Sequence, residues 1–252
     1  LFLSKQRLEP ALRVTENVAT LTADGPPRIR RVEPNVVTLD FVDVTAGGET
    51  KKAVYVLKAA DFAFKKNGMD RNPWDGAVQF RDEIISRKCP ADSGFEAVYR
   101  FTIAEKVPAT LAIVIERADI YTVTCNDKPV AARKGEWWLD RSFGRIDIAA
   151  VVVVGENVVR IKATPFTVFH ELESAYLLGD FAAKPSQSGF LVAPPEELGL
   201  GPWNKQGLPL YSTGVGYSQK FDVAAPSGRY RVSLPKWYGS VAQVNVNRKP
   251  AG

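Results

Sequence analysis

The residues of this chain that come closest to a reactive set are four consecutive ones, His170, Glu171, Leu172 and Glu173. In an extended strand Glu171 and Glu173 would project from the same face, beside the only histidine of the chain. Carboxylates next to an imidazole could transfer protons or bind a metal ion. However, the sequence has neither a His-Glu-x-x-His motif nor a second histidine to complete a zinc site. We therefore interpret His170 as a hydrogen-bonded structural residue at a domain boundary, and the reactive role remains the alternative.

A second group of oxygen-bearing side chains follows at short intervals: Asn67, Asp70, Asn72 and Asp75. Carboxylate and amide carbonyl oxygens are ligands of Ca²⁺, which takes about six to eight of them. The spacing differs from that of the helix-loop-helix calcium motif, and the proline in this loop would hold the same residues in an ordinary polar turn. We keep Asn67, Asp70 and Asn72 as candidate calcium ligands and expect no other cofactor.

Two of the five tryptophans have neighbours suited to a sugar ring. The C–H groups of a sugar stack on a flat aromatic face, while carboxylate and guanidinium groups bind its hydroxyls. Large aromatic residues also fill sandwich cores and domain boundaries, so each tryptophan has a structural interpretation as well. The candidate ligand-binding residues form two groups: Arg71, Trp74 and Asp75, and Trp138, Asp140 and Arg141.

Several kinds of chemistry find no support in the sequence. There is no Gly-x-Ser-x-Gly nucleophile motif, no Walker loop and no dinucleotide-binding glycine pattern. A pair of carboxylates that hydrolyses glycosides is defined by its separation in space, which a sequence does not give. We therefore predict no catalytic residue in this chain.

The charge and the hydrophobicity of the sequence exclude two classes of binding partner from our expectations. The net charge is +5, but the basic residues are scattered among 28 acidic ones, so we expect no nucleic-acid partner. No apolar run approaches the roughly 18 to 20 residues of a membrane span, so we expect no membrane partner. Cys89 and Cys125 are too few for a disulfide framework. An extracellular or periplasmic location would permit one disulfide between them, and the sequence does not decide between the two states.

Two segments of the chain resemble each other, 94–131 and 214–252. In each, an alternating strand is followed by an apolar strand and then by a strand that breaks at Asn-x-Lys-Pro. We interpret the unit as an antiparallel hairpin module that is used twice. Because the common Asn-Gly turn is replaced by Asn126-Asp127 and Asn247-Arg248, we expect loops of three or more residues there.

Short strands separated by Gly, Pro and Asn turns predict an all-β chain of two tandem antiparallel β-sandwiches of the jelly-roll type, with little helix. A clean strand is expected over 35–44 and a short helix over 59–66, ended by Asn67-Gly68. The second sandwich lacks the closing strands of the first, and an open sheet edge promotes aggregation, so we interpret the 252 residues as a piece of a longer polypeptide. The expected organisation is a connector (1–16), the first sandwich (17–183), a linker rich in Pro, Gly and Ser (184–209) and a partial second sandwich (210–252).

Several motifs of the chain carry a resemblance to known proteins. The turns at 126–129 and 155–159 resemble those of galactose-binding-domain-like sandwiches, including the sugar-binding domain of family 2 glycoside hydrolases. A closer likeness is to the region behind the catalytic barrel in α-L-rhamnosidase-like glycoside hydrolases. It rests on Leu39-Asp40-Phe41, Asn72-Pro73-Trp74-Asp75, the stretch Trp138 to Gly144, His170 to Glu173, Tyr176 to Phe181 and Gly201-Pro202-Trp203.

The resemblance implies an accessory role. In that family the acid and base carboxylates lie on the barrel, which this chain does not contain. Our leading hypothesis is a non-catalytic region of a glycoside hydrolase acting on plant or microbial polysaccharide, with a glycan and the catalytic barrel of the same polypeptide as partners. One alternative is a free-standing carbohydrate-binding module or lectin. Another is a small hydrolase or lyase with its own site near Trp74, His170 and Glu171.

Overall fold

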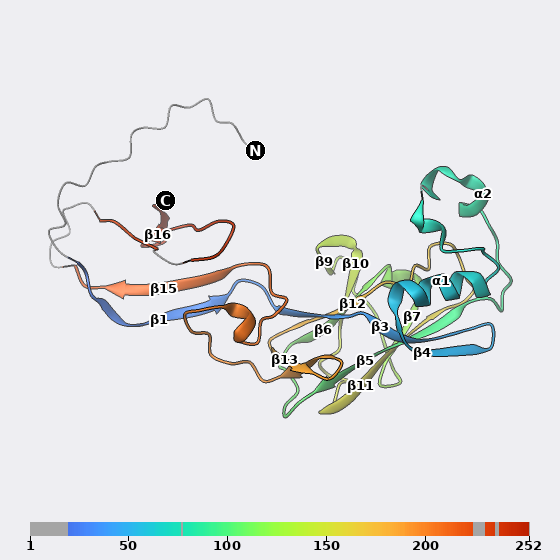
Figure 1. The fold of residues 1–252 in the computed structure, drawn as a ribbon, viewed down its shortest axis with the longest axis horizontal. Helices are drawn as coiled ribbons and strands as arrows, with labels where there is room; N and C mark the ends of the chain where they lie inside the picture. The colour runs from blue at the N-terminus through green and yellow to red at the C-terminus, as the bar shows by residue number, and fades with distance from the viewer. Residues whose placement is uncertain (1–19, 77, 224–229, 235–236, 252) are drawn as a thin grey trace. The chain divides into compact units, whose positions relative to one another are not determined.

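The computed structural model describes residues 20–76, 78–223, 230–234 and 237–251, with all of their side chains except those of Asp75 and Gln79. They form two compact units: Ile29–Gly216 is one, and the described parts of Leu1–Arg28 and Tyr217–Gly252 are the other. Strands predominate (Figure 1), which confirms the predicted all-β class with little helix.

The helices are α1 (Val56–Lys66) and α2 (Asp82–Ile85), with short 3₁₀ helices η1 (Pro73–Asp75), η2 (Val78–Phe80), η3 (Ala118–Ile120) and η4 (Trp203–Lys205). The strands are β1 (Ala23–Arg31), β2 (Asn35–Leu39), β3 (Phe41–Ala46), β4 (Glu49–Tyr55), β5 (Phe95–Ile103), β6 (Leu111–Glu116), β7 (Thr122–Cys125), β8 (Lys128–Val130), β9 (Trp137–Trp138), β10 (Asp140–Asp147), β11 (Gly155–Ala163), β12 (Ala175–Gly179), β13 (Ala182–Ser186), β14 (Gly189–Ala193), β15 (Val215–Phe221), β16 (Asn245–Val246) and β17 (Lys249–Pro250).

The unit Ile29–Gly216 is a β-sandwich of two sheets. The five-stranded sheet has the strand order β2-β12-β6-β10-β9. Six strands of the eight-stranded sheet have the order β13-β14-β5-β11-β7-β8. The other two are β3, which pairs with β5, and β4, which pairs with β3. Within the described strands of this unit, neighbours are antiparallel apart from β14 and β5, which meet in parallel at Val192 and Ile103.

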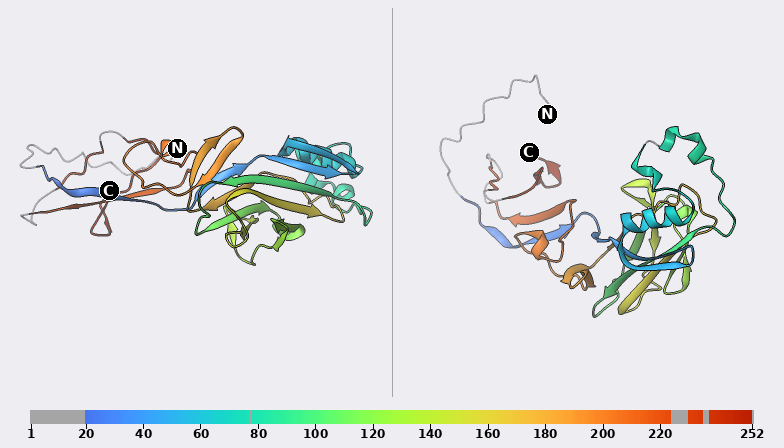
Figure 2. Two further views of the ribbon diagram at one scale, coloured as in Figure 1. Left: turned by 90° about the horizontal axis from the view of Figure 1, so that it is seen from below. Right: turned by 45° about the vertical axis from the view of Figure 1, so that its right-hand side comes forward.

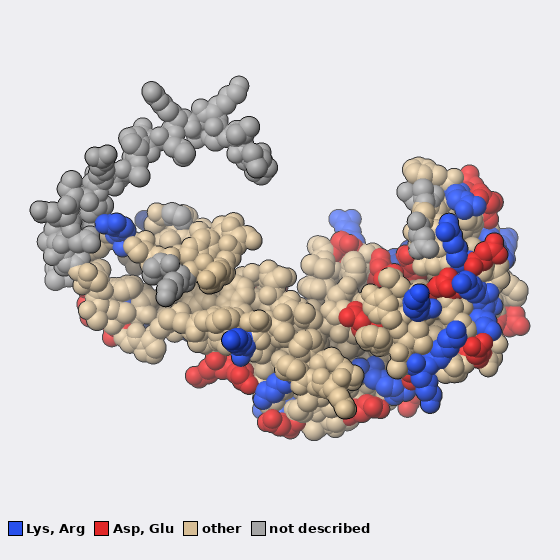
Figure 3. Space-filling view, in the orientation of Figure 1, with Lys and Arg blue, Asp and Glu red and all other residues tan. Residues whose placement is uncertain are grey.

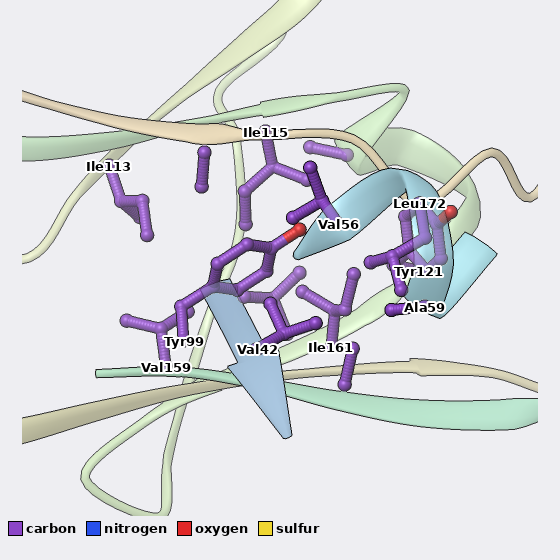
Figure 4. Close-up of a cluster of buried hydrophobic side chains, with 14 of the residues drawn as sticks. Val42, Val56, Ala59, Tyr99, Ile113, Ile115, Tyr121, Val159, Ile161 and Leu172 are labelled. Atoms are coloured by element: carbon purple, nitrogen blue, oxygen red, sulfur yellow. The ribbon is translucent and has the colours of Figure 1, made fainter. Parts of the chain in front are cut away.

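The hydrophobic core lies between the two sheets (Figure 4). Period-two alternation decides which side chains enter it, because Ala97, Tyr99 and Phe101 of β5 are buried while Arg100 is exposed. Figure 4 shows the Tyr99 ring extending from its own sheet toward Ile115 of β6. Both faces that meet here are apolar, so burial of this surface supplies the main driving force for folding.

Helix α1 packs against β3 and β4, as Figure 2 shows. It buries Ala59, Ala63 and Phe64 in the core. The structure confirms the predicted helix and its end at Asn67-Gly68, where Gly68 has φ +80°, although the helix begins three residues earlier than expected, at Val56.

The chain passes from one sheet to the other at Asp40. The sequence predicted a single strand over 35–44, but β2 belongs to the five-stranded sheet and β3 to the eight-stranded one. Val37 and Val42 are therefore both buried, while Phe41 is 61% exposed. The single-strand prediction is wrong because the apolar alternation Val37-Leu39-Phe41 continues across Asp40 in the sequence, whereas the buried face changes there from odd to even positions.

Strands β5 and β6 of the predicted hairpin module do not pair with each other. β5 pairs with β11 and β3 in one sheet, whereas β6 pairs with β12 and β10 in the other. The interpretation of 94–131 as a hairpin module therefore holds only for its last part, where β7 and β8 pair antiparallel across Asn126-Asp127. Alternation and apolar runs identify strands, but two apolar faces that meet across a sandwich core look the same in sequence as two paired strands.

The turns at Asn126 and Asn247 are tighter than expected. The φ angles are 49° and 62° at Asn126-Asp127, and 49° and 68° at Asn247-Arg248. In each hairpin the residues that flank these two pair directly across the strands. Positive φ at both central residues defines a two-residue type I′ turn, so the prediction of longer loops is wrong. Asn tolerates this conformation well, and the same turn occurs in both segments.

The segment 184–209, for which the composition predicted a linker, is joined to the sandwich in the structure. β14 lies within it and pairs with β13. The carbonyl oxygen of Gly207 accepts hydrogen bonds from the Ala183 N–H and the Asn35 side chain, both at 2.8 Å. The Tyr211 hydroxyl, just beyond, bonds to the backbone of Val32 at 3.1 Å. Prolines and glycines prevent long strands here, but they do not prevent these contacts.

In the other unit, β1 pairs with β15 and β16 pairs with β17. The Gln219 side chain donates to the carbonyl oxygens of Asp24 and Gly25 at 3.3 and 3.0 Å. The predicted connector 1–16 lies outside the described residues, and the partial second sandwich over 210–252 stays a prediction. Within the described part of the chain, no helix combines the length and the apolar character that crossing a membrane requires.

Candidate functional site

The outer face of the five-stranded sheet, which points away from the core, is covered by apolar side chains. Register places Val114 of β6 beside Tyr176 of β12 and Arg145 of β10 on this face, because their neighbours Ile113 and Ile115 point into the core. Val114 is nevertheless fully buried, at 0% exposure. A second layer of side chains must therefore cover the sheet on this side.

Three aromatic rings lie together on this face. Trp138 lies 5.1 Å from Tyr176 between ring centroids, with the planes tilted by 53°. Phe143 lies 6.1 Å from Tyr176 at 63°. All three rings are only partly buried, and the adjacent Trp137 is 49% exposed. We call Trp138, Phe143 and Tyr176 the aromatic face. Partly exposed, tilted rings of this kind can stack against the apolar side of a ligand.

Carboxylates border the aromatic face. Glu116 pairs with Phe143 across β6 and β10. Burial raises the pKa of Glu116, the nearby Asp140 raises it further, and Arg117 opposes this. Burial also raises the pKa of Glu173, with Glu116 adding to the effect. These half-buried carboxyl groups can accept hydrogen bonds from the hydroxyls of a bound molecule.

The segment that carries Glu171 and Glu173 is anchored to the core through its backbone. The Glu173 carbonyl oxygen accepts a hydrogen bond from the Tyr99 hydroxyl at 2.5 Å, and that of Glu171 accepts one from Tyr121 at 2.8 Å. The two side chains remain about half-buried. Burial, followed by the charges of Glu173 and Glu116, raises the pKa of Glu171 to about 7. Its carboxyl group therefore gains and loses a proton near neutral pH.

His170 is buried and hydrogen-bonded, as predicted, but its contacts lie within the unit Ile29–Gly216 and not at a domain boundary. It is 4% exposed, and both ring nitrogens are engaged. The backbone N–H of Thr167 donates to Nδ1 at 2.9 Å, which leaves the ring proton on Nε2 to donate to the Ile120 carbonyl oxygen at 3.0 Å. The ring also packs against Tyr121 with centroids 5.1 Å apart. Burial lowers the pKa of His170, so the neutral ring is favoured and both bonds are kept.

The predicted group around Trp138 belongs to the site. Trp138 is part of the aromatic face, and Asp140 follows it at the start of β10. The Asp140 carboxylate accepts hydrogen bonds from the backbone N–H and the hydroxyl of Ser142, both at 2.7 Å, and these bonds hold its pKa below the usual value. Arg141 is exposed on the same strand.

The predicted group around Trp74 lies elsewhere, in the loop region between α1 and β5. The Trp74 indole N–H donates to the Val168 carbonyl oxygen at 2.7 Å, and the half-buried ring packs against the core. Arg71 is exposed and lines a cavity of about 310 Å³ together with Asp70. The side chain of Asp75 lies outside the described part of the structure. The predicted group around Trp74 is therefore not part of the site that contains the predicted group around Trp138.

Two of the three candidate calcium ligands already accept hydrogen bonds. The side-chain oxygen of Asn67 accepts the Gly94 N–H at 2.8 Å, and that of Asn72 accepts the Trp74 N–H at 3.1 Å. The described residues contain no cluster of three or more His, Cys, Asp or Glu side chains placed to hold a metal ion. Calcium binding stays a prediction.

The cysteines are free in the structure. Cys125 is buried in β7, and burial raises the pKa of its thiol to about 11. A thiol with such a pKa is almost entirely protonated at neutral pH, which makes it a poor nucleophile.

Sequence reasoning did not single out Tyr176, Phe143, Glu116 or Arg145 as site residues. A signal was present in β10, where Phe143 and Arg145 alternate with the core-facing Gly144 and Ile146. Arg145 also has a buried Nε atom without a hydrogen-bond partner among the described residues. The tyrosine and the glutamate could be placed only through the order of the strands.

Comparison with protein-family models and with curated protein sequences found no match. Among solved structures, the chain is similar to the crystal structure of an FMN-binding beta-glucuronidase from Facaelibacterium prausnitzii L2-6, with a TM-score of 0.32 and 13% sequence identity. The similarity covers 68% of this chain and 29% of that chain, so this chain corresponds to less than a third of that protein. A likeness at this level does not assign a function to the chain.

Proposed function

We propose that this chain is a non-catalytic, glycan-binding β-sandwich region of a glycoside hydrolase that acts on plant or microbial polysaccharide. The observation that carries the proposal is the aromatic face, in which Trp138, Phe143 and Tyr176 lie together, partly exposed, outside the hydrophobic core. The proposed partners are a glycan and a catalytic barrel of the same polypeptide. An extracellular or periplasmic location, where polysaccharide is met, is part of the same proposal.

The surroundings of the face suit a sugar better than a purely apolar ligand. A sugar ring presents C–H groups on its flat sides and hydroxyl groups around its rim. Partly exposed rings match the first, and the carboxylates of Glu116, Asp140 and Glu173 at the border match the second. An apolar ligand would displace water from these bordering carboxylates and offer them no hydrogen-bond donor in exchange, at a cost in binding free energy.

The proposal is tested by calorimetric titration of the full chain with a panel of plant and microbial oligosaccharides. Trp138→Ala and Tyr176→Ala should each weaken binding about tenfold or more, which corresponds to about 1.4 kcal/mol. Phe41→Ala is the matched control, because it removes an aromatic ring that is 61% exposed on the other sheet. Equal affinities for the Trp138→Ala variant and the unmodified chain would exclude the aromatic face as the binding surface.

The accessory role is tested separately by the mass of the native polypeptide. A mass well above 27.7 kDa, with a catalytic barrel in the additional sequence, would support a region of a glycoside hydrolase. A native protein of this mass that binds glycans would instead be a free-standing carbohydrate-binding module or lectin.

A small glycan hydrolase or lyase is the second candidate, because of Glu171. A carboxyl group with a pKa of about 7 beside the charges of Glu173 and Glu116 resembles the pair of acids that glycoside hydrolysis uses. Turnover of an aryl glycoside by the purified chain, abolished by Glu171→Gln, would favour this function over the accessory one. Absence of turnover in the unmodified chain would exclude the hydrolase or lyase function.

A further inference from the structure

The loop region between α1 and β5 contains a cavity that the aromatic face does not share. Its volume is about 310 Å³, near the lower end of the range of about 300 to 1,000 Å³ for small-molecule sites. It is lined by Gly68, Met69, Asp70, Arg71, Pro73, Gly76, Arg81, Ile84 and Arg87.

The cavity is positively charged. Three arginines and one aspartate give its lining a formal charge of +2. Figure 3 shows Lys and Arg side chains gathered, with some acidic ones among them, over the part of the sandwich that carries α1, α2 and β4. The lining therefore carries an excess of positive charge, while Asp82 and Glu83, directly after Arg81 in α2, add acidic groups beside it.

The arginines keep hydrogen-bond donors available. Arg71 makes no ion pair or hydrogen bond among the residues that the structure describes. Arg81 uses its Nε to bond Glu83 at 2.9 Å, and Arg87 uses Nη2 to bond the Gly68 carbonyl oxygen at 2.7 Å. Because a guanidinium has five N–H donors, both retain donors for a ligand.

The guanidinium of Arg87 lies close to a glycine. Gly68 has φ +80°, and a Cβ at this position would lie 3.1 Å from Nη2 of Arg87. The hydrogen bond from Arg87 to the Gly68 carbonyl oxygen, at 2.7 Å, places the guanidinium at the wall of the cavity.

We propose that this cavity binds the acidic group, a carboxylate or a sulfate, of a saccharide. The planar fork of an arginine pairs with two oxygens of such a group at once. Asp70 would accept hydrogen bonds from sugar hydroxyls, and Met69, Pro73 and Ile84 form an apolar wall for the ring. The anion preference stands on the arginines alone, whereas the saccharide as its carrier rests on the function proposed above.

The test compares Arg71→Ala with Lys88→Ala in the full chain. Both remove one positive charge from exposed residues of the same loop region, but Lys88 does not line the cavity. Calorimetric titration with an oligogalacturonate, a sulfated oligosaccharide, a neutral oligosaccharide of equal length and inorganic sulfate separates the ligand classes. We expect Arg71→Ala to weaken binding of one acidic oligosaccharide at least tenfold and Lys88→Ala to weaken it less than twofold.

These measurements distinguish anion binding in the cavity from glycan binding at the aromatic face. If Trp138→Ala abolishes binding of neutral oligosaccharide and Arg71→Ala does not, the two sites are independent and both proposals stand. If the aromatic face binds nothing but the Arg71-dependent binding persists, the cavity proposal survives alone. Equal losses in Arg71→Ala and Lys88→Ala, equal affinity for acidic and neutral oligosaccharides, or inorganic sulfate binding as tightly as the acidic oligosaccharides would each overturn it.

Discussion

The substitution Glu171→Gln should stabilise the protein at high pH and have little effect at low pH. Gln is close to Glu in size but carries no charge. In the folded protein, burial and the charges of Glu173 and Glu116 raise the pKa of Glu171 from 4.5 to about 7. Between these two values the folded protein binds more protons than the unfolded chain. The stability from this group is therefore fully present below pH 4.5 and is lost as the pH rises through about 7.

The size of the effect follows from the shift. A difference of about 2.5 pKa units corresponds to about 3.4 kcal/mol at most, at 1.36 kcal/mol per unit. Because the carboxyl group is only half-buried, solvent screening reduces this figure, and we expect about 1 to 2 kcal/mol. The Gln variant should gain this amount over the unmodified protein at pH 8 and almost none at pH 4.5.

Urea unfolding of both proteins, followed by tryptophan fluorescence at pH 4.5, 6, 7 and 8, measures the difference. Taking the difference at each pH removes the contributions of all other titrating groups. Glu197→Gln is the control, since it removes a carboxylate from an exposed loop residue and should change the free energy of unfolding by less than about 0.5 kcal/mol at every pH. A difference for Glu171→Gln that is constant with pH, or that grows as the pH falls, would refute the reasoning.

Three further substitutions test the packing. Asn157→Ala removes a buried amide that makes four hydrogen bonds, and urea unfolding should show a loss of about 3 kcal/mol or more. Tyr99→Phe leaves the Glu173 carbonyl oxygen without its donor and should cost about 1 to 2 kcal/mol by the same measurement; a cost near zero would mean that water replaces the hydroxyl. Gly94→Ala would place a Cβ 1.9 Å from the Ala163 carbonyl oxygen, so thermal unfolding should shift down by about 10 °C, at roughly 2 to 4 °C per kcal/mol for a domain of this size, and an unchanged midpoint would contradict the close approach.

The sequence predicts much of the local structure of this protein and little of its strand order. Alternation at the start of 94–131 correctly predicts the strand β5, and the Asn67-Gly68 pair correctly ends α1. These features depend on neighbours in the chain. Whether β5 pairs with β6 or faces it across the core depends on distant strands, since β11 lies between β5 and β7 in the sheet.

The same limit applies to the site. The sequence singled out Trp138 because Asp140 and Arg141 follow it closely. It did not single out Tyr176 as a ligand-binding residue, because 38 positions separate it from Trp138 and only the neighbouring strands β12, β6 and β10 bring the two together. Trp74 had equally suitable neighbours, but its ring is held by the Val168 carbonyl oxygen and the core.

The aromatic face has two possible purposes, and strand β6 shows how to separate them. Residues 111–115 of β6 are buried on both sides of the sheet, so the outer face needs an apolar cover whether or not a ligand binds there. A leucine in place of Trp138 would provide such an apolar cover. Leucine has no flat face on which a sugar ring could stack. Trp138→Leu should therefore cost only about 1 kcal/mol of stability, because the indole is partly exposed, while glycan affinity falls at least tenfold. Calorimetric titration and urea unfolding of this one variant measure both effects. A loss of more than about 3 kcal/mol in stability with glycan binding unchanged would show that the rings serve as cover alone.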